Sequence, residues 1–180
     1  MIPRADSIQL LHSYIESTAL RHHCEMVATA MEAYAKSLSK SNTEIDEWWI
    51  AGLLHDLDWE KYPDEHPNYA IEHIFPNYDI SEEVIEAIKA HAPERTAKKP
   101  ETEIERYLFA VDELSGFMHA VSLMRPTGFD GMKPKSVTKK LKTANFAANV
   151  SRDDINEGAK LIDMPLNDHI QFLIGVFHTA

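Results

Sequence analysis

The segment Ala51-Gly52-Leu53-Leu54-His55-Asp56-Leu57 places a histidine and an aspartate side by side at the end of an apolar helical stretch. Both side chains are poorly suited to an apolar core but are good metal ligands. Neighbouring residues on a helix diverge by roughly 100 degrees. We therefore expect the helix to end near His55, so that both side chains reach one metal, or Asp56 to bridge two.

Four further residues stand where a shared metal centre could use them. In chain order the set reads His…His-Asp…His…His…Asp, and its members are His23, His55, Asp56, His66, His91 and Asp112. Imidazole and carboxylate ligands suit Fe, Mn, Zn, Co or Ni, and the lack of thiolates argues against a structural zinc site. Asp112 is expected in mid-helix, where a metal would offset the cost of burying its carboxylate.

Apolar residues recur at three- and four-residue steps, and no segment alternates with a period of two, so helices are predicted throughout. We predict 93–100 to be a loop. The first predicted helix is capped by Asp6, the second spans 18–38, and the third is opened by a capping box of Thr43 and Asp46. The fourth has Pro67 at its first position, the fifth is begun by Ser81, and the sixth spans 102 to about 124. The last three are a basic helix from about Lys135, one begun by Ser151, and one that spans 165–177. The chain is expected to be a single all-α domain over residues 1–180.

Composition restricts the possible partners. A length of 180 residues suits one core. The net charge of −11 argues against binding long nucleic acid, and no apolar run reaches the ~18 residues of a membrane span. The N-terminus lacks a signal-peptide pattern, and Cys24 is the only cysteine, so we expect a cytoplasmic protein without a disulfide. Monomer and homodimer both stay open.

The segments Leu20–His23, Gly52–Asp56, Ala87–His91 and Phe109–Glu113 resemble the HD superfamily of metal-dependent phosphohydrolases. The resemblance spans residues 20–113 and implies an HD-domain-like helical bundle, with residues 115–180 as further helices without a catalytic signature. It implies that His23, rather than His22, binds a first metal together with His55, Asp56 and Asp112. His66 and His91 resemble the additional histidines of the dinuclear branch, in which Asp56 bridges two metals. For His66 the alternative is a loop histidine that caps the Pro67 helix.

The resemblance implies hydrolysis of a phosphomonoester or a nucleotide by a water molecule activated on one or two divalent metal ions. His55 and Asp56 would form the catalytic centre, with Glu60 or Glu113 as candidates for proton transfer. Two alternatives stay open: a di-iron oxygenase of the same superfamily, and a non-catalytic metal-bound module that binds a ligand.

Many members that cleave nucleotides carry a lysine soon after the His-Asp pair, whereas this chain has Leu57-Asp58-Trp59-Glu60, followed by Lys61. A basic cluster either lines the pocket mouth or forms a solvated helix face; its members are Arg125, Lys133, Lys135, Lys139, Lys140 and Lys142. The other histidines are expected to be surface residues or hydrogen-bonded core residues; these are His12, His73, His119, His169 and His178. Cys24 is expected to be a packed cysteine rather than a nucleophile.

Overall fold

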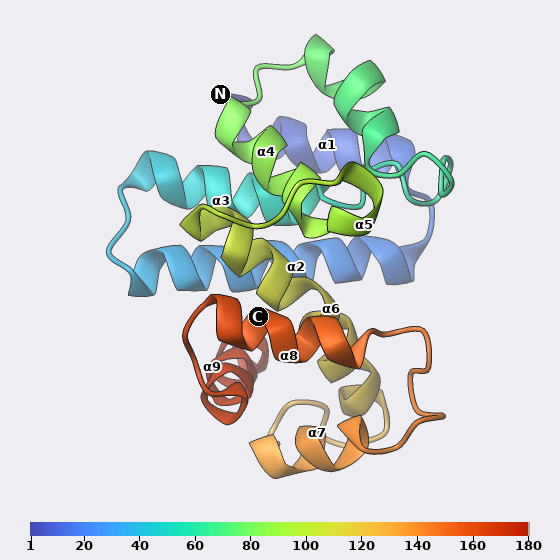
Figure 1. Ribbon diagram of the computed structural model, residues 1–180, viewed down its shortest axis with the longest axis vertical. Helices are drawn as coiled ribbons and strands as arrows, with labels where there is room; N and C mark the ends of the chain where they lie inside the picture. The colour runs from blue at the N-terminus through green and yellow to red at the C-terminus, as the bar shows by residue number, and fades with distance from the viewer. Residues whose placement is uncertain (180) are drawn as a thin grey trace.

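The computed structural model describes residues 1–179 as a bundle of helices, with no β-strand in that range (Figure 1). The first half contains α1 (Arg4–Tyr14), α2 (Thr18–Ser37), α3 (Asn42–Leu54), the short π-helix η1 (Ala70–Ile74), the 3-10 turn η2 (Phe75–Asn77) and α4 (Glu82–His91). The second half contains α5 (Pro93–Thr96), α6 (Glu103–Leu123), α7 (Pro134–Leu141), α8 (Arg152–Leu161) and α9 (Leu166–His178). The all-α prediction is confirmed. None of these helices has the length and apolar character needed to cross a membrane.

The antiparallel pair α2 and α3 forms the centre of the fold, with α4 and α6 packed on it (Figure 1). Gly52 of α3 sits directly against Ala28 of α2. A Cβ atom at position 52 would lie 2.8 Å from the backbone N and Cα of Ala28. The close contact between these two helices therefore depends on a glycine at the start of the segment that carries His55 and Asp56.

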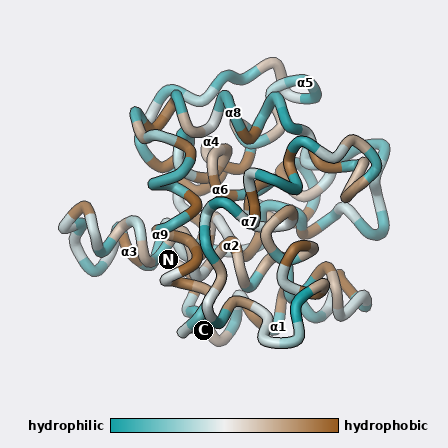
Figure 2. The backbone as a smooth tube through the Cα atoms, turned by 90° about the horizontal axis from the view of Figure 1, so that it is seen from below, coloured by the Kyte–Doolittle hydropathy of each residue, from teal (hydrophilic) through white to brown (hydrophobic). Residues whose placement is uncertain are grey.

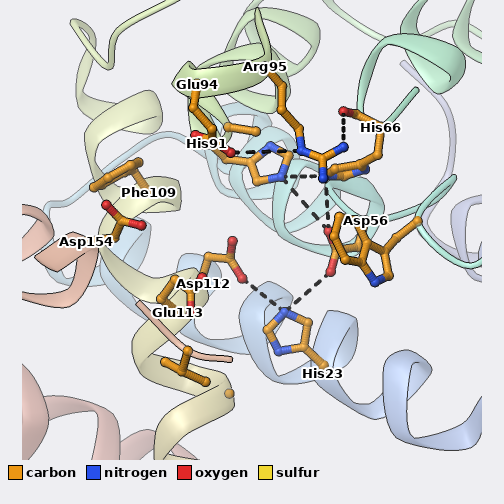
Figure 3. Close-up of a pocket in the computed structure, with 14 residues that line it drawn as sticks. His23, Asp56, His66, His91, Glu94, Arg95, Phe109, Asp112, Glu113 and Asp154 are labelled. Atoms are coloured by element: carbon orange, nitrogen blue, oxygen red, sulfur yellow. Dashed lines mark hydrogen bonds and ion pairs between the residues drawn. The ribbon is translucent and has the colours of Figure 1, made fainter. Parts of the chain in front are cut away.

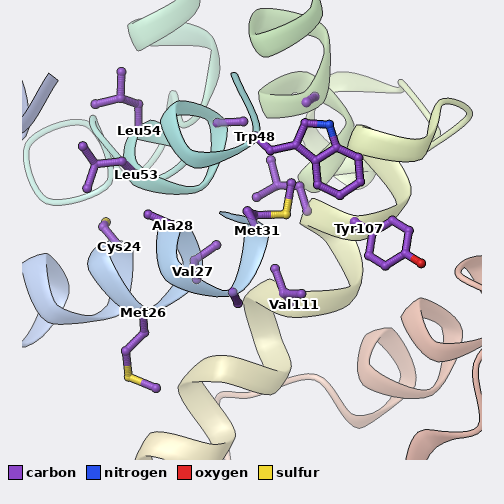
Figure 4. Close-up of a cluster of buried hydrophobic side chains, with 14 of the residues drawn as sticks. Cys24, Met26, Val27, Ala28, Met31, Trp48, Leu53, Leu54, Tyr107 and Val111 are labelled. Atoms are coloured by element: carbon purple, nitrogen blue, oxygen red, sulfur yellow. The ribbon is translucent and has the colours of Figure 1, made fainter. Parts of the chain in front are cut away.

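The core is one continuous cluster of apolar side chains that extends from Ile2 to Phe177. Its central part joins α2, α3 and α6 through fully buried side chains such as Val27, Leu53 and Val111 (Figure 4). In Figure 2, hydrophobic and hydrophilic positions alternate along α8, as expected when a helix buries one face. A single domain over 1–180 stays a prediction, which this shared core supports.

Several predicted helix starts are confirmed. The hydroxyl groups of Ser17, Ser81 and Ser151 accept backbone N–H bonds in the first turns of α2, α4 and α8. The expected end of the third helix is confirmed as well, because α3 stops at Leu54 and residues 55–61 form turns.

The capping box of α3 is shifted from its predicted place. Ser41 and Glu44 form it, rather than Thr43 and Asp46. Asp46 instead accepts a hydrogen bond from Arg4 Nε at 2.7 Å, which ties α1 to α3. This long-range contact determines the role of Asp46 and could not be seen from the local sequence.

Three other boundaries differ from the predictions. Residues 93–100, predicted as a loop, contain the short helix α5, which ends at Ala97 in the left-handed conformation. The first helix begins at Arg4, so Asp6 lies in its first turn instead of capping it. Helical structure after the cis His66–Pro67 bond begins at Asn68 and continues as η1, so Pro67 is not its first residue.

The C-terminal helices hold α6 in place around Ala110. A Cβ atom on Gly158 of α8 would lie 2.6 Å from the Cα of Ala110. The buried His169 of α9 donates from Nε2 to the Ala110 carbonyl at 3.0 Å and accepts at Nδ1 from the Tyr34 hydroxyl at 2.5 Å. His169 is therefore a hydrogen-bonded core residue, as predicted, and joins α9 to both α6 and α2.

We expect Gly52→Ala and Gly158→Ala each to lower the free energy of unfolding by about 1–3 kcal/mol, because the added methyl group would overlap backbone atoms of a neighbouring helix. Gly175→Ala is the matched control, since nothing lies within 4 Å of an added Cβ there. Urea unfolding of the three variants measures the difference. If all three variants were equally stable, the close helix contacts at Gly52 and Gly158 would not be required for the stability of the fold.

A second prediction concerns pH. Burial lowers the pKa of His169 to about 4, from its ordinary value of 6.5. Between these values the unfolded chain binds a proton at this position and the folded chain does not, so stability must fall as pH drops from about 6.5 to about 4. His169→Gln should remove up to about 3 kcal/mol of that pH dependence. The control is His178→Gln, at an exposed position. If the pH profile of His169→Gln parallels that of the control, the prediction is wrong.

Candidate metal centre

The six residues singled out in the sequence come from distant segments and meet at one pocket. His23 lies on α2, His55 and Asp56 follow α3, and His91 ends α4. His66 precedes η1, and Asp112 lies in the middle of α6. Five of the six line a pocket of about 280 Å³ (Figure 3), and His55 is fully buried behind them.

The first group of side chains able to hold a metal ion consists of His23, His55 and Asp112. His23 Nε2 lies 3.0 Å from Asp112 Oδ1 and 3.3 Å from His55 Nε2. His55 Nε2 is also 3.3 Å from Asp112 Oδ1. The adjacent His22 is exposed and packs on His119 instead, so the structure places His23, not His22, in this group.

The second group consists of Asp56, His66 and His91. The Nε2 atoms of the two histidines are 3.1 Å apart, and Asp56 Oδ1 lies 3.5 Å from that of His66 and 3.9 Å from that of His91. The other oxygen of Asp56, Oδ2, faces the first group, at 3.4 Å from His55 Nε2 and 3.7 Å from His23 Nε2. Each oxygen of this carboxylate thus faces a different group, which is the arrangement that a bridging ligand needs.

The hydrogen bonds of the second group indicate that a cation belongs between its histidines. His91 Nδ1 donates to the Ile88 carbonyl at 2.5 Å, and His66 Nδ1 donates to Asp58 Oδ1 at 2.6 Å. With the proton on Nδ1, a neutral imidazole presents a lone pair at Nε2. Burial lowers the pKa of His91 to about 4, which keeps its ring neutral at pH 7. Two lone pairs facing each other at 3.1 Å repel unless a cation lies between them, so these donors fit a bound metal.

In the first group, ionised carboxylates require a positive charge. Burial alone would lower the pKa of His55, but the neighbouring Asp56 and Asp112 outweigh it and hold the pKa well above its ordinary value. Burial likewise acts to raise the pKa of Asp112, yet His55 and His23 hold it well below the ordinary value. Without a metal, His55 therefore carries a proton at Nε2, since its Nδ1 donates to the Gly52 carbonyl. A metal ion would replace that proton.

Asp58 was missed as a functional residue in the sequence. Its fully buried carboxylate accepts hydrogen bonds from His66 Nδ1 and, at 2.8 Å, from the backbone N of Ala70. A carboxylate behind a histidine ligand fixes the ring orientation and increases the basicity of the ligand. The signal available in the sequence was an aspartate that follows the His-Asp pair by two residues and precedes His66 by eight. His66 bonds Asp58 through Nδ1 and Ala70 bonds Asp58 through its backbone N, so the contacts of His66 fit a ligand better than a loop histidine that caps the following helix.

Several residues considered for substrate binding or proton transfer lie elsewhere. Glu60 accepts hydrogen bonds from the backbone N of Glu16 and Ser17, so it supports the start of α2 and its candidacy for proton transfer was wrong. Lys61 donates to the Ser13 carbonyl. No member of the basic cluster Arg125–Lys142 is among the pocket-lining residues within 1–179. The interpretation of that cluster as a solvated face therefore fits better.

Glu113, the other candidate for proton transfer, lies at the pocket. Its Oε2 accepts from the backbone N of Ser151 at 3.2 Å. Burial, together with the nearby Asp112 charge, raises the pKa of Glu113 to about 7.

Cys24 is fully buried, and this burial raises the pKa of its thiol well above the ordinary value. A thiol in that state is a poor nucleophile, which agrees with a packing role.

Comparison with protein families gives one match: the HD domain, over residues 20–116, which is more than half of the chain. The matched range contains all six residues of the two groups. The resemblance predicted from the four segments between Leu20 and Glu113 is thereby confirmed. Neither the comparison with curated proteins nor that with solved structures gave a match.

We expect Asp58→Asn to lower the affinity of the second group for its metal by about 10–100-fold, because the carboxylate behind His66 is lost. Elemental analysis after dialysis against limiting Mn²⁺ should give about two equivalents for the wild type and about one for Asp58→Asn. Asp64→Asn, at an exposed position in the same loop, is the matched control and should behave as the wild type. Equal metal content in the two variants would contradict the role given to Asp58.

Proposed function

Because this chain belongs to the HD-domain family, a superfamily of metal-dependent hydrolases, we propose that it hydrolyses a phosphomonoester or a nucleotide. The observation that supports this most strongly is the position of Asp56 between the two ligand groups on the wall of one pocket. A carboxylate with one oxygen toward each group suits two ions held close together, the arrangement that serves in-line displacement at phosphorus.

Under this proposal His23, His55, Asp112 and one oxygen of Asp56 hold the first metal, while His66, His91 and the other oxygen hold the second. A divalent ion bound there supplies Lewis acidity and lowers the pKa of a bound water. The protein fixes the ligands through buried acceptors such as the Gly52 and Ile88 carbonyls. Glu113, which lines the pocket, is the residue we propose for proton transfer.

We further propose that the site holds one or two divalent ions, each Fe, Mn, Co, Ni or Zn, and that the substrate is a small phosphorylated molecule. We also propose that the chain is a single domain and that the protein is cytoplasmic. The free, buried Cys24 and the net charge of −11 support a reducing compartment and a partner other than long nucleic acid.

A di-iron oxygenase is the second candidate, because the geometry offers protein ligands for two ions, and this is also what that chemistry requires. The two candidate reactions differ in whether they need a redox-active metal ion and O2. Hydrolysis should proceed without O2 and with a redox-silent metal, whereas the oxygenase would require iron and consume O2. A firmly bound metal without turnover in either assay would favour a non-catalytic module.

We expect Asp56→Ala to reduce kcat/KM for phosphate esters by more than about a hundredfold, since even outer-shell partners of a metal ligand typically cost up to that amount. Anaerobic phosphate release from a panel of monoesters and nucleotides, with Mn²⁺ added, measures the loss. Circular dichroism should show an unchanged helix content, and Asp64→Ala is the control for the removal of a carboxylate nearby. Undiminished turnover by a folded Asp56→Ala protein would refute the mechanism.

A further inference from the structure

The pocket contains one basic side chain. Among residues 1–179, the only lysine or arginine that lines it is Arg95, on α5. Figure 3 shows Arg95 on the side of the pocket that carries His66 and His91. Three carboxylates outside the two ligand groups, those of Glu94, Glu113 and Asp154, line the same pocket.

The guanidinium of Arg95 is held in a defined orientation. Its Nη1 donates to the carbonyl of Pro63 at 2.6 Å and to that of His66 at 3.2 Å. The group stacks over Trp59, 5.1 Å from the ring centroid, and Trp59 in turn meets His66 edge-on. These contacts remove much of the side-chain freedom that an arginine would otherwise lose on binding a ligand.

The remaining donors of this group are available to a ligand. The two hydrogens of Nη1 are used by the two carbonyls, whereas Nε and Nη2 have no hydrogen-bond acceptor within residues 1–179. Glu94 Oε1 forms an ion pair with Nε at 4.0 Å, which is too long for a hydrogen bond and leaves the N–H of Nε without an acceptor in the described residues. The Arg95 side chain is 32% exposed, so an incoming ligand can reach these N–H groups. A planar fork of N–H donors matches the oxygens of a phosphoryl group.

The geometry points to Arg95 as the residue that binds the substrate phosphoryl group, in a pocket that selects esters with a single phosphate and no further negative charge. This inference rests on the proposed function and deepens it. The carboxylates of Glu94, Glu113 and Asp154 line the same pocket, and among residues 1–179 no second lysine or arginine lines it that could neutralise another phosphate. A volume of about 280 Å³ lies at the small end for ligand pockets, which also favours a small ester.

The test compares Arg95→Met and Arg95→Lys with Lys139→Met, which removes the same charge from an exposed position outside the pocket. The probes are p-nitrophenyl phosphate as substrate and inorganic phosphate as competitive inhibitor. We expect Arg95→Met to raise both KM and the inhibition constant of phosphate about tenfold or more, with metal content unchanged. Arg95→Lys should recover part of this loss, and Lys139→Met should match the wild type.

A purely structural role of Arg95, acting through the loop that carries His66, gives a different result. Metal content and kcat would then fall together while the inhibition constant of phosphate stayed at the wild-type value. That outcome would overturn the inference.

Selectivity is tested with a nucleoside monophosphate and the corresponding triphosphate. We expect kcat/KM to favour the monophosphate by about tenfold or more, since each added negative charge is repelled by the carboxylates that line the pocket. The double variant Glu94→Gln/Asp154→Asn should narrow this ratio. A wild-type preference for the triphosphate would overturn the inference.

Failure of the inference is distinguishable from failure of the proposed function. If no ester is hydrolysed, yet inorganic phosphate raises the Tm of the metal-loaded wild type and not of Arg95→Met, the anion site stands and the hydrolase proposal falls. If hydrolysis is robust and its KM is the same in Arg95→Met, the hydrolase proposal stands and the role of Arg95 falls.

Discussion

The half-buried carboxylate of Asp56 lies between two groups of imidazoles, and the structure depends on the balancing of its negative charge. Asp56 and Asp112 stay ionised only because positive charge is held beside them, either as a proton on His55 or as a metal ion. The ligand groups are drawn from α2, α4, α6 and the turns after α3. A displacement of any one of these elements would leave a buried carboxylate or imidazole without its partner, which is costly. The precision of helix packing is therefore also a requirement of the site.

The residues after Ser115, which carry no catalytic signature, acquire a role from this constraint. Gly158 and His169 both contact α6 at Ala110, two residues before Asp112. His169 also binds Tyr34 on α2, the helix that carries His23. The C-terminal helices thus fix the relative position of two helices that contribute to the first ligand group. They also supply Asp154 to the pocket wall, so they affect both the geometry and the charge of the site.

The sequence was sufficient for the all-α class, for most helix starts and for the six residues that meet at the pocket. These features depend on local signals: apolar periodicity, serine caps, and side chains that are costly to bury without a cation. Asp58 and Arg95 were missed because their roles depend on contacts with other segments of the chain. The capping box of Ser41 and Glu44 is a local Ser-x-x-Glu pattern, and the neighbouring pair Thr43 and Asp46 was predicted in its place. The donors of Arg95 are directed by carbonyls of Pro63 and His66, about 30 residues earlier. Charge density along the chain pointed only to the basic cluster Arg125–Lys142, for which a solvated helix face was the other interpretation, and charge density does not show which cation lies beside the site.

The charges of the pocket also bear on the kind of substrate it can accept. The four histidines are neutral when they ligate metal, so the groups contribute two negative charges, those of Asp56 and Asp112. Two divalent ions would leave an excess of two positive charges, which would balance the two negative charges of a phosphomonoester dianion. The single positive charge of Arg95 shares the pocket with the carboxylates of Glu94 and Asp154, and with Glu113, whose pKa of about 7 leaves it partly ionised at neutral pH. A second phosphate on the substrate would find no unbalanced cation, whereas one phosphate placed between the metals and Arg95 would leave the inner pocket close to neutral. Electrostatic balance thus favours a small monoester, and the carboxylates that produce this balance come from α5, α6 and α8 rather than from the residues that follow the His-Asp pair.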